Sequence, residues 1–501
     1  MKTTHKPNAI YGALMGALAL LGAAAPANAA DAKPNIVYIV ADDLGWQDVG
    51  FNGCADIKTP NIDKLAETGA KFTQFYAQPM CTPTRAALMT GRYPFRYGLQ
   101  TIVIPGPAGY GLATNEWLMP QCLGDAGYTT AIIGKWHLGH ANTIYWPRQR
   151  GFDYQYGAMI GELDYYTHSD AGVLDWFRNN KPVHEKGYTT QLIGNDAVKY
   201  INGQSADKPF YLYLTFNAPH TPYEAPQDYI DRYQNIADPT RRIYAGMVSC
   251  MDDEIGRVVA ALDQKGLRDN TLIIFQSDNG GTRNAMFAGQ MADLSKIRIP
   301  CDNGPYRDGK GSLFEGGCRV AAFANWPGHI KPETVDGMIH AVDMYPTLAA
   351  LAGASTAKCL PLDGLDVWPT ISANAPSPRT ELVYNVEPFR GAVREGDWKL
   401  IWRTLIPTSV DLYNLAEDPY ETNNVAAAHP DKVAAMQDRL NALGKASAKP
   451  LALMYVAGVG LAHGQPRMGS EDGKGAVMVE GDGHSITDQD AGEDENNAAS
   501  H

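Results

Sequence analysis

The sequence predicts an α/β protein with a large, mostly parallel sheet between helices, followed by a small C-terminal α+β subdomain with an antiparallel sheet. From residue 34 to about residue 370, short apolar runs rich in β-branched residues alternate with helical patterns, which is typical of strand–helix–strand units. After that the pattern changes to short strands at Glu381–Tyr384, Gly391–Arg394 and Trp398–Trp402, and then to a helix near Asp431–Leu443.

Four apolar runs of the first region are each followed by polar residues. The runs cover residues 35–41, 128–133, 210–216 and 271–276. Ligands of open α/β sheets bind outside the carboxyl ends of the strands, so these polar residues are expected to share one site. The residues are Asp42 and Asp43, Lys135 and His137, Asn217 and His220, and Asp278 and Asn279.

Composition limits the class of protein. The 501 residues include 55 Asp and Glu against 42 Lys and Arg, which gives a net charge of −13. An acidic balance argues against a nucleic-acid-binding protein, because such proteins need a basic face. A hydrophobic content of 45% is enough for a globular core, and seven cysteines are too few for a disulfide scaffold in a chain of this length.

The first 29 residues match an export signal. Lys2, His5 and Lys6 precede an apolar stretch over residues 9–24, and small residues follow at the expected cleavage site after Ala29. The apolar run is shorter than the roughly 20 residues that a membrane span needs. We therefore expect a cleaved signal peptide, a periplasmic or secreted protein, and no membrane anchor.

The remaining chain divides into three expected parts. Residues 30–374 form the main α/β domain, and residues 375–450 form the α+β subdomain after the linker Ala375–Pro378. Residues 451–501 are expected to be a disordered tail, because most of this stretch is rich in glycine and acids and poor in apolar residues.

The carboxylates at the strand ends are candidate metal ligands. Adjacent Asp42 and Asp43 repel each other unless a cation neutralises them, and Asp278 and Asn279 add two oxygen ligands. Oxygen ligands suit Ca²⁺ or Mg²⁺ rather than zinc. The alternative is that Asp42 caps a helix and that Asp278 and Asn279 form a turn.

The segment around Cys81 is the most informative. Pro83 suits a first helical turn, the residues up to Met89 propagate a helix, and Gly91 ends it. Cys81 then lies at a helix N-terminus, where backbone N–H groups bind anions, and Arg85 adds a donor for a tetrahedral oxyanion one turn later. The alternatives are a buried structural cysteine and a reactive thiolate of low pKa.

Two segments resemble the signatures of one enzyme family. Cys81-Thr-Pro-Thr-Arg85, extended through Thr90-Gly91, resembles the C-x-P-x-R signature of type I sulfatases, and Gly127–His137 resembles the second signature of that family. The resemblance covers about residues 34–445. It looks closest to the arylsulfatase B (N-acetylgalactosamine-4-sulfatase) branch at Gly98–Gln100, at His137–His140, and at Arg150–Asp153 leading to Asp164–His168.

The resemblance implies an alkaline-phosphatase-like sandwich and a modified Cys81. A separate formylglycine-generating enzyme would oxidise Cys81 to formylglycine, although Thr84 stands where many relatives have serine. The implied metal is Ca²⁺ rather than Mg²⁺, with Asp42, Asp43, Asp278, Asn279 and residue 81 as ligands. The implied sulfate pocket consists of Cys81, Arg85, Lys135, His137, His220 and Lys310, the last in Asp308–Ser312.

These residues allow hydrolysis of a sulfate ester. A hydrated aldehyde offers one hydroxyl to attack sulfur and a second whose deprotonation expels sulfate. His220, with Lys310, is the candidate acid, and His137 is the candidate base. Two alternatives stay open: a phosphate or phosphonate ester hydrolase of the same superfamily, and a non-catalytic protein that binds sulfated glycans.

The expected substrate is a sulfated sugar or an aryl sulfate, with the branch resemblance favouring the sugar. Aromatic residues gather at Tyr145-Trp146, Tyr154–Tyr156, Tyr165-Tyr166 and Trp176-Phe177. They either hold a ring of the substrate or pack an inserted segment. The net negative charge offers no general attraction to a long polyanion, which favours a small or terminal sulfated unit.

Overall fold

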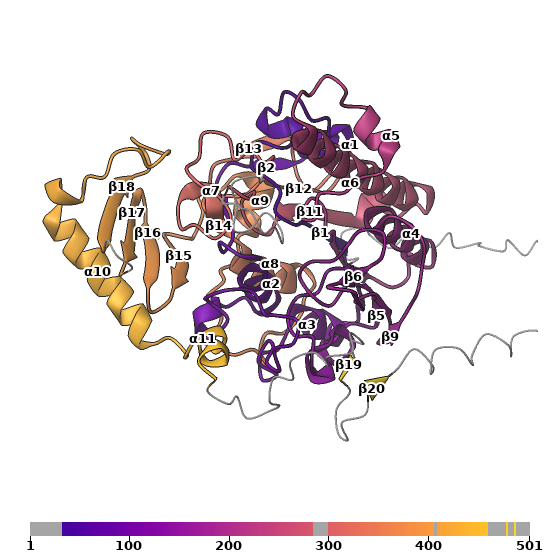
Figure 1. Ribbon diagram of the computed structural model, residues 1–501, viewed down its shortest axis with the longest axis horizontal. Coiled ribbons are helices and arrows are strands. Elements are labelled where there is room, and N and C mark those ends of the chain that lie inside the picture. Colours follow the sequence, from indigo (N-terminus) through magenta and orange to yellow (C-terminus); the bar gives the residue numbers. More distant parts are fainter. Residues whose placement is uncertain (1–32, 284–298, 405–407, 459–476, 479–484, 487–501) are drawn as a thin grey trace, which may run out of the picture. The chain divides into compact units, whose positions relative to one another are not determined.

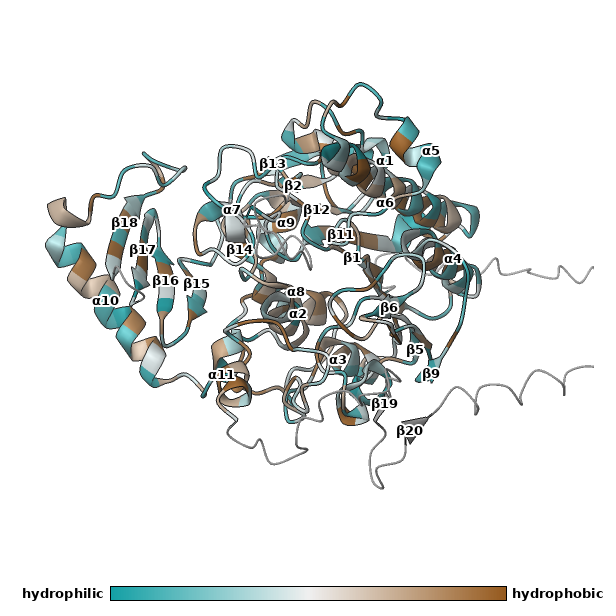
Figure 2. Cartoon of the chain, viewed as in Figure 1, coloured by the Kyte–Doolittle hydropathy of each residue, from teal (hydrophilic) through white to brown (hydrophobic). Residues whose placement is uncertain are grey.

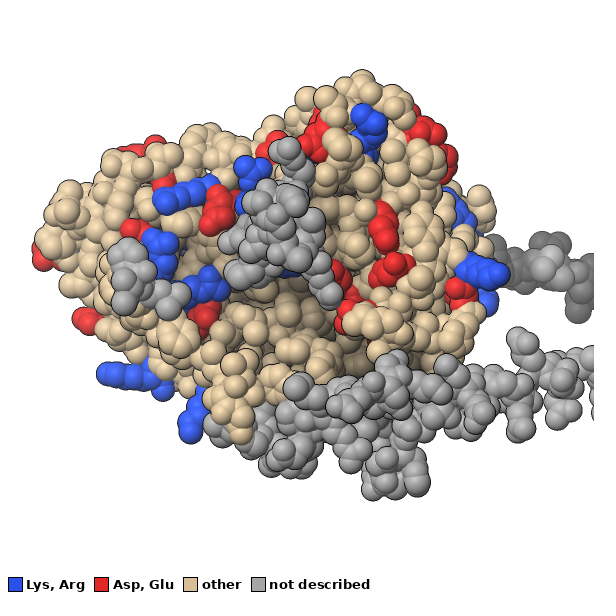
Figure 3. Space-filling model, in the orientation of Figure 1, with Lys and Arg blue, Asp and Glu red and all other residues tan. Residues whose placement is uncertain are grey.

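The computed structural model describes residues 33–283, 299–404, 408–458, 477–478 and 485–486. The predicted signal peptide, and most of the glycine- and acid-rich end of the chain, lie outside these residues. No helix among the described residues is long and apolar enough to cross a membrane. On the face shown in Figure 3, acidic and basic side chains are interspersed.

Within the described residues, ten strands form one mixed sheet in the order β13-β2-β12-β11-β1-β10-β4-β5-β8-β9. The neighbours from β11 to β5 run parallel, while β12 and β8 run antiparallel to them. The strands are β1 (Asn35–Ala41), β2 (Ala70–Phe72), β4 (Thr129–Gly134), β5 (Tyr154–Gly157), β8 (Phe177–Arg178), β9 (Lys181–Pro182), β10 (Phe210–Thr215), β11 (Thr271–Ser277), β12 (Ala322–Asn325) and β13 (Glu333–Val335). The predicted α/β class with a mostly parallel sheet is confirmed.

Helices cover both faces of this sheet (Figure 1). Alternate side chains of the central strands pack into two separate cores, as expected for a sheet buried on both sides. One face carries α2 (Cys81–Thr90), α3 (Met119–Asp125) and α8 (Met344–Leu351), and the other carries α1 (Pro60–Glu67), α4 (Thr189–Asn202) and α6 (Pro239–Gln264). The shorter helices are α5 (Gln227–Asp231), α7 (Glu315–Cys318) and α9 (Trp368–Ala373).

The register of the central strands aligns their carboxyl ends. Ala41 of β1 pairs with Ser277 of β11, and Val40 pairs with Thr215 of β10, which in turn pairs with Gly134 of β4. The residues that follow these strands therefore emerge at one edge of the sheet, as the sequence predicted.

A second sheet follows the main domain. It has the order β15-β16-β17-β18 and is antiparallel throughout. Its strands are β15 (Glu381–Val386), β16 (Arg390–Glu395), β17 (Trp398–Arg403) and β18 (Ser409–Asn414), and α10 (Pro430–Lys445) packs on it. Figure 2 shows apolar and polar residues alternating along α10. Its apolar Met436, Leu440 and Leu443 are buried in a core that also takes up Tyr93 and Phe95 of the main domain.

The prediction that an unstructured tail begins at residue 451 is wrong. Leu451–Val456 form helix α11, and the Leu451 N–H donates to the Gly98 carbonyl oxygen at 2.9 Å. Ala452 is buried in the main core, so apolar burial orders this segment. Further along, β19 (Val477–Met478) pairs with β20 (Ser485–Ile486). Two other short ladders join β3 (Phe75–Tyr76) to β14 (Ile339–His340) and β6 (Ser169–Asp170) to β7 (Val173–Leu174).

Candidate active site

Cys81 begins helix α2 at the edge of the sheet, as the sequence predicted. Met80 before it is extended, and Gly91 ends the helix in the left-handed region at φ 67°. The thiol is buried, and its Sγ lies 3.3 Å from Asp42 Oδ1. Burial, followed by the charges of Asp278 and Asp42, raises the pKa of the Cys81 thiol well above its ordinary value. Without a bound cation, this environment favours the protonated thiol over the alternative of a reactive thiolate of low pKa.

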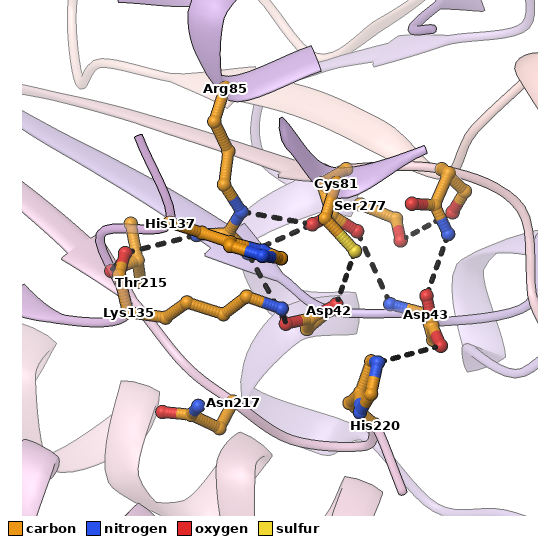
Figure 4. A network of polar contacts seen from close by, with 12 residues as sticks. Asp42, Asp43, Cys81, Arg85, Lys135, His137, Thr215, Asn217, His220 and Ser277 are labelled. Atoms are coloured by element: carbon orange, nitrogen blue, oxygen red, sulfur yellow. Dashed lines mark hydrogen bonds and ion pairs between the residues drawn. The ribbon is translucent and has the colours of Figure 1, made fainter. Parts of the chain in front are cut away.

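A first group of ion pairs surrounds Asp42 (Figure 4). Lys135 forms a short ion pair with Asp42 Oδ2, and Arg85 lies 3.4 Å from the same oxygen. Arg85 also donates through Nε and one terminal nitrogen to Asp278 Oδ2, at 3.0 and 2.8 Å. These side chains are fully buried, so each charge depends on its partners to offset the loss of hydration.

A second group surrounds Asp43. Lys310 donates to Asp43 Oδ2 at 2.8 Å and lies 3.0 Å from His220 Nε2. Thr282 and Asn279 also donate to the Asp43 carboxylate, at 3.2 and 2.7 Å. Burial alone would raise the pKa of Asp43, but the charge of Lys310 brings it below its ordinary value. Asp43 is thus a carboxylate held by several donors.

His220 is a neutral imidazole in this arrangement. Burial and the neighbouring Lys310 lower the pKa of His220 to about 3. Its Nδ1 lies 2.7 Å from the Thr221 carbonyl oxygen. Because a carbonyl only accepts, Nδ1 carries the ring proton, and Nε2 is left to accept from Lys310. Burial, followed by the charge of Lys135, also lowers the pKa of His137 well below its ordinary value.

The site fits a divalent cation. Ligand atoms of Asp42, Asp43, Cys81 and His220 all lie within 4.8 Å of one another. Asn279 Oδ1 is buried without a hydrogen-bond partner among the described residues, which leaves an oxygen to serve as a ligand. Asp278 completes a set of three carboxylates, which face Arg85, Lys135 and Lys310. Because these charges balance, a bound cation would make the site positive and attractive to an anion.

The sequence of this chain matches a known family over the same region. The sulfatase profile matches residues 34–354, which contain every residue of the site. The chain belongs to the sulfatase family. A second profile, named for the C-terminal part of N-sulphoglucosamine sulphohydrolase, matches residues 307–446 and so covers both Lys310 and the second sheet of this sulfatase.

Named relatives support the same conclusion. The sulfatase is 36% identical over 394 residues to mouse arylsulfatase J, covering 76% of this chain but 63% of that protein. It is 36% identical over 380 residues to mouse N-acetylgalactosamine-6-sulfatase, covering 72% of this chain and 69% of that protein. Because two differently named relatives match equally well, the arylsulfatase B branch stays a prediction.

A solved structure confirms the fold class. The sulfatase resembles Ps i-CgsB, crystallised in complex with k-i-k-neocarrahexaose, with a TM-score of 0.74 and 34% identity. The match covers 83% of this chain and 94% of that chain. The sulfatase-type sandwich and the small antiparallel sheet are therefore both as predicted.

The structure brings the predicted side chains of the sulfatase site together, although their roles stay predictions. These are Asp42, Asp43, Cys81, Arg85, Lys135, His137, His220, Asp278, Asn279 and Lys310. One residue of the site was missed: Thr282, three positions after Asn279, donates to Asp43. Asn217 was expected at the shared site but was given no role. It follows β10 and is buried, with both polar side-chain atoms lacking a partner among the described residues.

Most aromatic side chains of these segments pack in the interior of the protein. Trp146, Tyr156, Tyr165, Trp176 and Phe177 are all buried, whereas Tyr166 is 46% exposed. His168 stacks on Trp176 with ring centroids 4.9 Å apart, and Trp176 meets Tyr156 edge to face. These rings support the segment between β5 and β9, so they offer little surface to a substrate.

Proposed function

We propose that this sulfatase hydrolyses a sulfate ester on a sugar, with residue 81 as formylglycine and Ca²⁺ as the metal. The observation that carries the proposal is the placement of Cys81. It lies at a helix N-terminus beside Asp42, in a site that also holds the cations of Arg85, Lys135 and Lys310. Such a site binds a tetrahedral anion and places its central atom against residue 81.

Ca²⁺ rather than Mg²⁺ is proposed from the donor set. Asp42, Asp43, Asp278 and Asn279 would hold it together with residue 81. Oxygen-rich sites of several carboxylates suit the larger Ca²⁺, whereas Mg²⁺ usually keeps several waters. When bound, the metal would polarise the attacking hydroxyl and help to neutralise the sulfate.

In the first step, one hydroxyl of the hydrated residue 81 gives its proton to the neighbouring Asp42 carboxylate and attacks sulfur, and the bond from sulfur to the ester oxygen breaks. Arg85, Lys135 and Lys310 stabilise the charge that builds on the sulfate oxygens. The leaving oxygen takes a proton from the Lys310–His220 pair. Lys310 supplies the proton, and His220 orients the Lys310 ammonium by accepting from it at Nε2, because the imidazole is neutral before the substrate binds.

In the second step, the remaining hydroxyl of residue 81 loses its proton to His137. The carbonyl re-forms, the bond between carbon and the sulfate oxygen breaks, and sulfate leaves. A neutral His137 is suited to accept this proton, and the environment of its ring favours that form. A serine at position 81 would lack the second hydroxyl, which gives the modification its chemical purpose.

A sulfated sugar is the substrate class that the relatives support. N-acetylgalactosamine-6-sulfatase is named for a sulfated sugar, and Ps i-CgsB was crystallised with a neocarrahexaose. We place the mature protein in the periplasm or outside the cell, after cleavage of residues 1–29. A formylglycine-generating enzyme is its partner during maturation.

The decisive experiment is peptide mass spectrometry across Cys81 in protein purified from its own host, combined with turnover of sulfated monosaccharides. An aldehyde or its hydrate at position 81, together with released sulfate, supports the proposal. An intact thiol in an active enzyme would contradict the proposed nucleophile. Fully modified protein that binds sulfated sugars without turnover would instead support the glycan-binding alternative.

A further inference from the structure

We propose that Asp175 is a positioning residue for His137, acting through the chain segment 158–161. The inference rests on the proposed function, in which His137 is the base of the second step. Asp175 does not touch the reacting atoms. It fixes the backbone against which the His137 imidazole lies.

The Asp175 carboxylate organises a turn of the backbone. Its Oδ2 accepts from the backbone N–H groups of Met159 and Ile160, at 2.9 and 2.8 Å. Asp175 is 1% exposed, and its own N–H donates to the His168 carbonyl oxygen at 2.9 Å. A buried carboxylate that accepts two N–H groups holds them firmly, because these charge-assisted bonds are strong.

The same turn holds the backbone of His137. The Met159 carbonyl oxygen accepts from the His137 N–H at 3.0 Å, and the Ala158 carbonyl oxygen accepts from the Trp136 N–H at 2.9 Å. The second oxygen of Asp175 lies 3.4 Å from His140 Nε2, just beyond His137 along the chain. Asp175 thus links two segments. One of its oxygens binds the backbone of segment 158–161, and the other lies beside His140 in segment 136–140.

Gly161 provides backbone surface against which the His137 imidazole packs. A Cβ atom at position 161 would lie 2.3 Å from Cε1 and 2.7 Å from Nε2 of His137. The ring therefore lies directly against the glycine backbone. Gly161 is not in the left-handed region, so alanine can adopt its backbone and would act only by pushing the ring.

His137 needs this support for two reasons. Its backbone has φ 59°, a region that a non-glycine residue keeps only when its surroundings fix it. In addition, its buried Nδ1 has no hydrogen-bond partner among the described residues, so no bond at that nitrogen orients the ring. Besides the turn, Thr82 Oγ1 donates to the His137 carbonyl oxygen at 3.0 Å. The backbone contacts and Gly161 thus take the place of a partner at Nδ1.

The test compares Gly161→Ala and Asp175→Asn with a matched glycine control. Gly124 in α3 has open space around a would-be Cβ atom, so Gly124→Ala should leave kinetics unchanged. We expect Gly161→Ala to lower kcat about 10- to 100-fold, because small misplacement of a catalytic group has that effect. KM should fall together with kcat, so that kcat/KM changes little, because the step that slows follows the formation of sulfated residue 81. The melting temperature should stay within about 2 °C. Asp175→Asn keeps one acceptor oxygen and should show a smaller fall in kcat.

The readout specific to positioning is the state of residue 81. If His137 is misplaced, the second step slows and a sulfated residue 81 accumulates with substrate, visible by peptide mass spectrometry. Wild-type kcat in Gly161→Ala, or a lower kcat without the sulfated peptide, would overturn the positioning role while wild-type turnover upholds the proposed function. Absence of sulfate release by modified wild-type protein would instead overturn the proposed function and, with it, this inference.

Discussion

Lys310 and His220 form a pair whose shared proton lies on the lysine. Lys310 Nζ is 3.0 Å from His220 Nε2, and the opposite ring nitrogen faces the Thr221 carbonyl oxygen. The charge of Asp43 raises the pKa of Lys310 despite its burial, while burial and Lys310 itself lower that of His220. The pair therefore enters the reaction as an ammonium hydrogen-bonded to a neutral imidazole, and a proton for the leaving group comes from the lysine side.

This arrangement predicts that the loss of turnover caused by His220→Ala depends on the leaving group of the substrate. Turnover of a sulfated sugar should fall about 10²- to 10⁴-fold, because an alkoxide leaves poorly without a proton. Turnover of 4-nitrophenyl sulfate should fall much less, since nitrophenolate leaves unprotonated. Steady-state kinetics on both substrates check this. The exposed His184 gives the control, and His184→Ala should change neither rate. An equal fall on both substrates would argue against an acid role.

Removal of divalent cations should abolish activity without unfolding the protein. The three carboxylates of the site already face three buried cations, so the metal-free site is not left with unpaired negative charge. Dialysis against a chelator should lower the melting temperature, because a ligand at 100 times its Kd stabilises the folded state by about 2.7 kcal/mol. Ca²⁺ should restore both activity and melting temperature. If verified metal-free protein keeps full activity, the metal assignment is wrong.

The strand ends were predictable because they depend on local pattern and sheet geometry alone. Asp42, Lys135, His220 and Asp278 each follow an apolar run, and parallel strands bring such ends together. The helix at Cys81 was equally local, with Pro83 near its start and Gly91 at its end. What these residues do chemically was suggested by the family resemblance rather than by spacing.

Other parts of the site and of the fold depend on contacts between residues far apart in the chain, which the sequence does not display. Lys310 follows no strand, and its loop is fixed when Lys310 and Gly311 donate their N–H groups to the carbonyl oxygens of Gly281 and Pro79. Asp175 acts on backbone amides, which carry no side-chain signature. Helix α11 is six residues long, too short for a clear periodic pattern, and is ordered by burial against the main domain.

Replacement of Cys81 by serine should convert the enzyme to a single turnover. Serine offers one hydroxyl in place of two, so it can accept sulfate but cannot expel it by re-forming a carbonyl. Mixing Cys81→Ser with 4-nitrophenyl sulfate should release at most one equivalent of nitrophenol, with sulfate retained on residue 81 by mass spectrometry. The half-buried Cys54 supplies the control, and Cys54→Ser should turn over normally. Sustained turnover by a variant verified to carry serine would contradict the two-hydroxyl mechanism.

The α4–α6 contact gives the protein a pH-dependent stability outside the active site. Glu254 of α6 is 3% exposed and lies in a notch of α4, where a Cβ atom at Gly194 would be 1.9 Å from Glu254 Oε2. Burial raises the pKa of Glu254 from 4.5 to about 7, although Arg257 donates to it at 2.6 Å. Arg257 is 48% exposed, so water weakens its effect.

Glu254 should therefore cost stability as the pH rises. Below pH 4.5 the Glu254 carboxyl is protonated in both the folded and the unfolded state, so it does not lower the free energy of unfolding. Between 4.5 and about 7 the folded state keeps a proton that the unfolded state has released, so the free energy of unfolding falls with rising pH. Glu254→Gln keeps the size and removes the titration. The variant should match the wild type in melting temperature near pH 4.5 and exceed it increasingly toward pH 7, measured by calorimetry. Parallel curves for the two proteins across this range would show that Glu254 keeps an ordinary pKa.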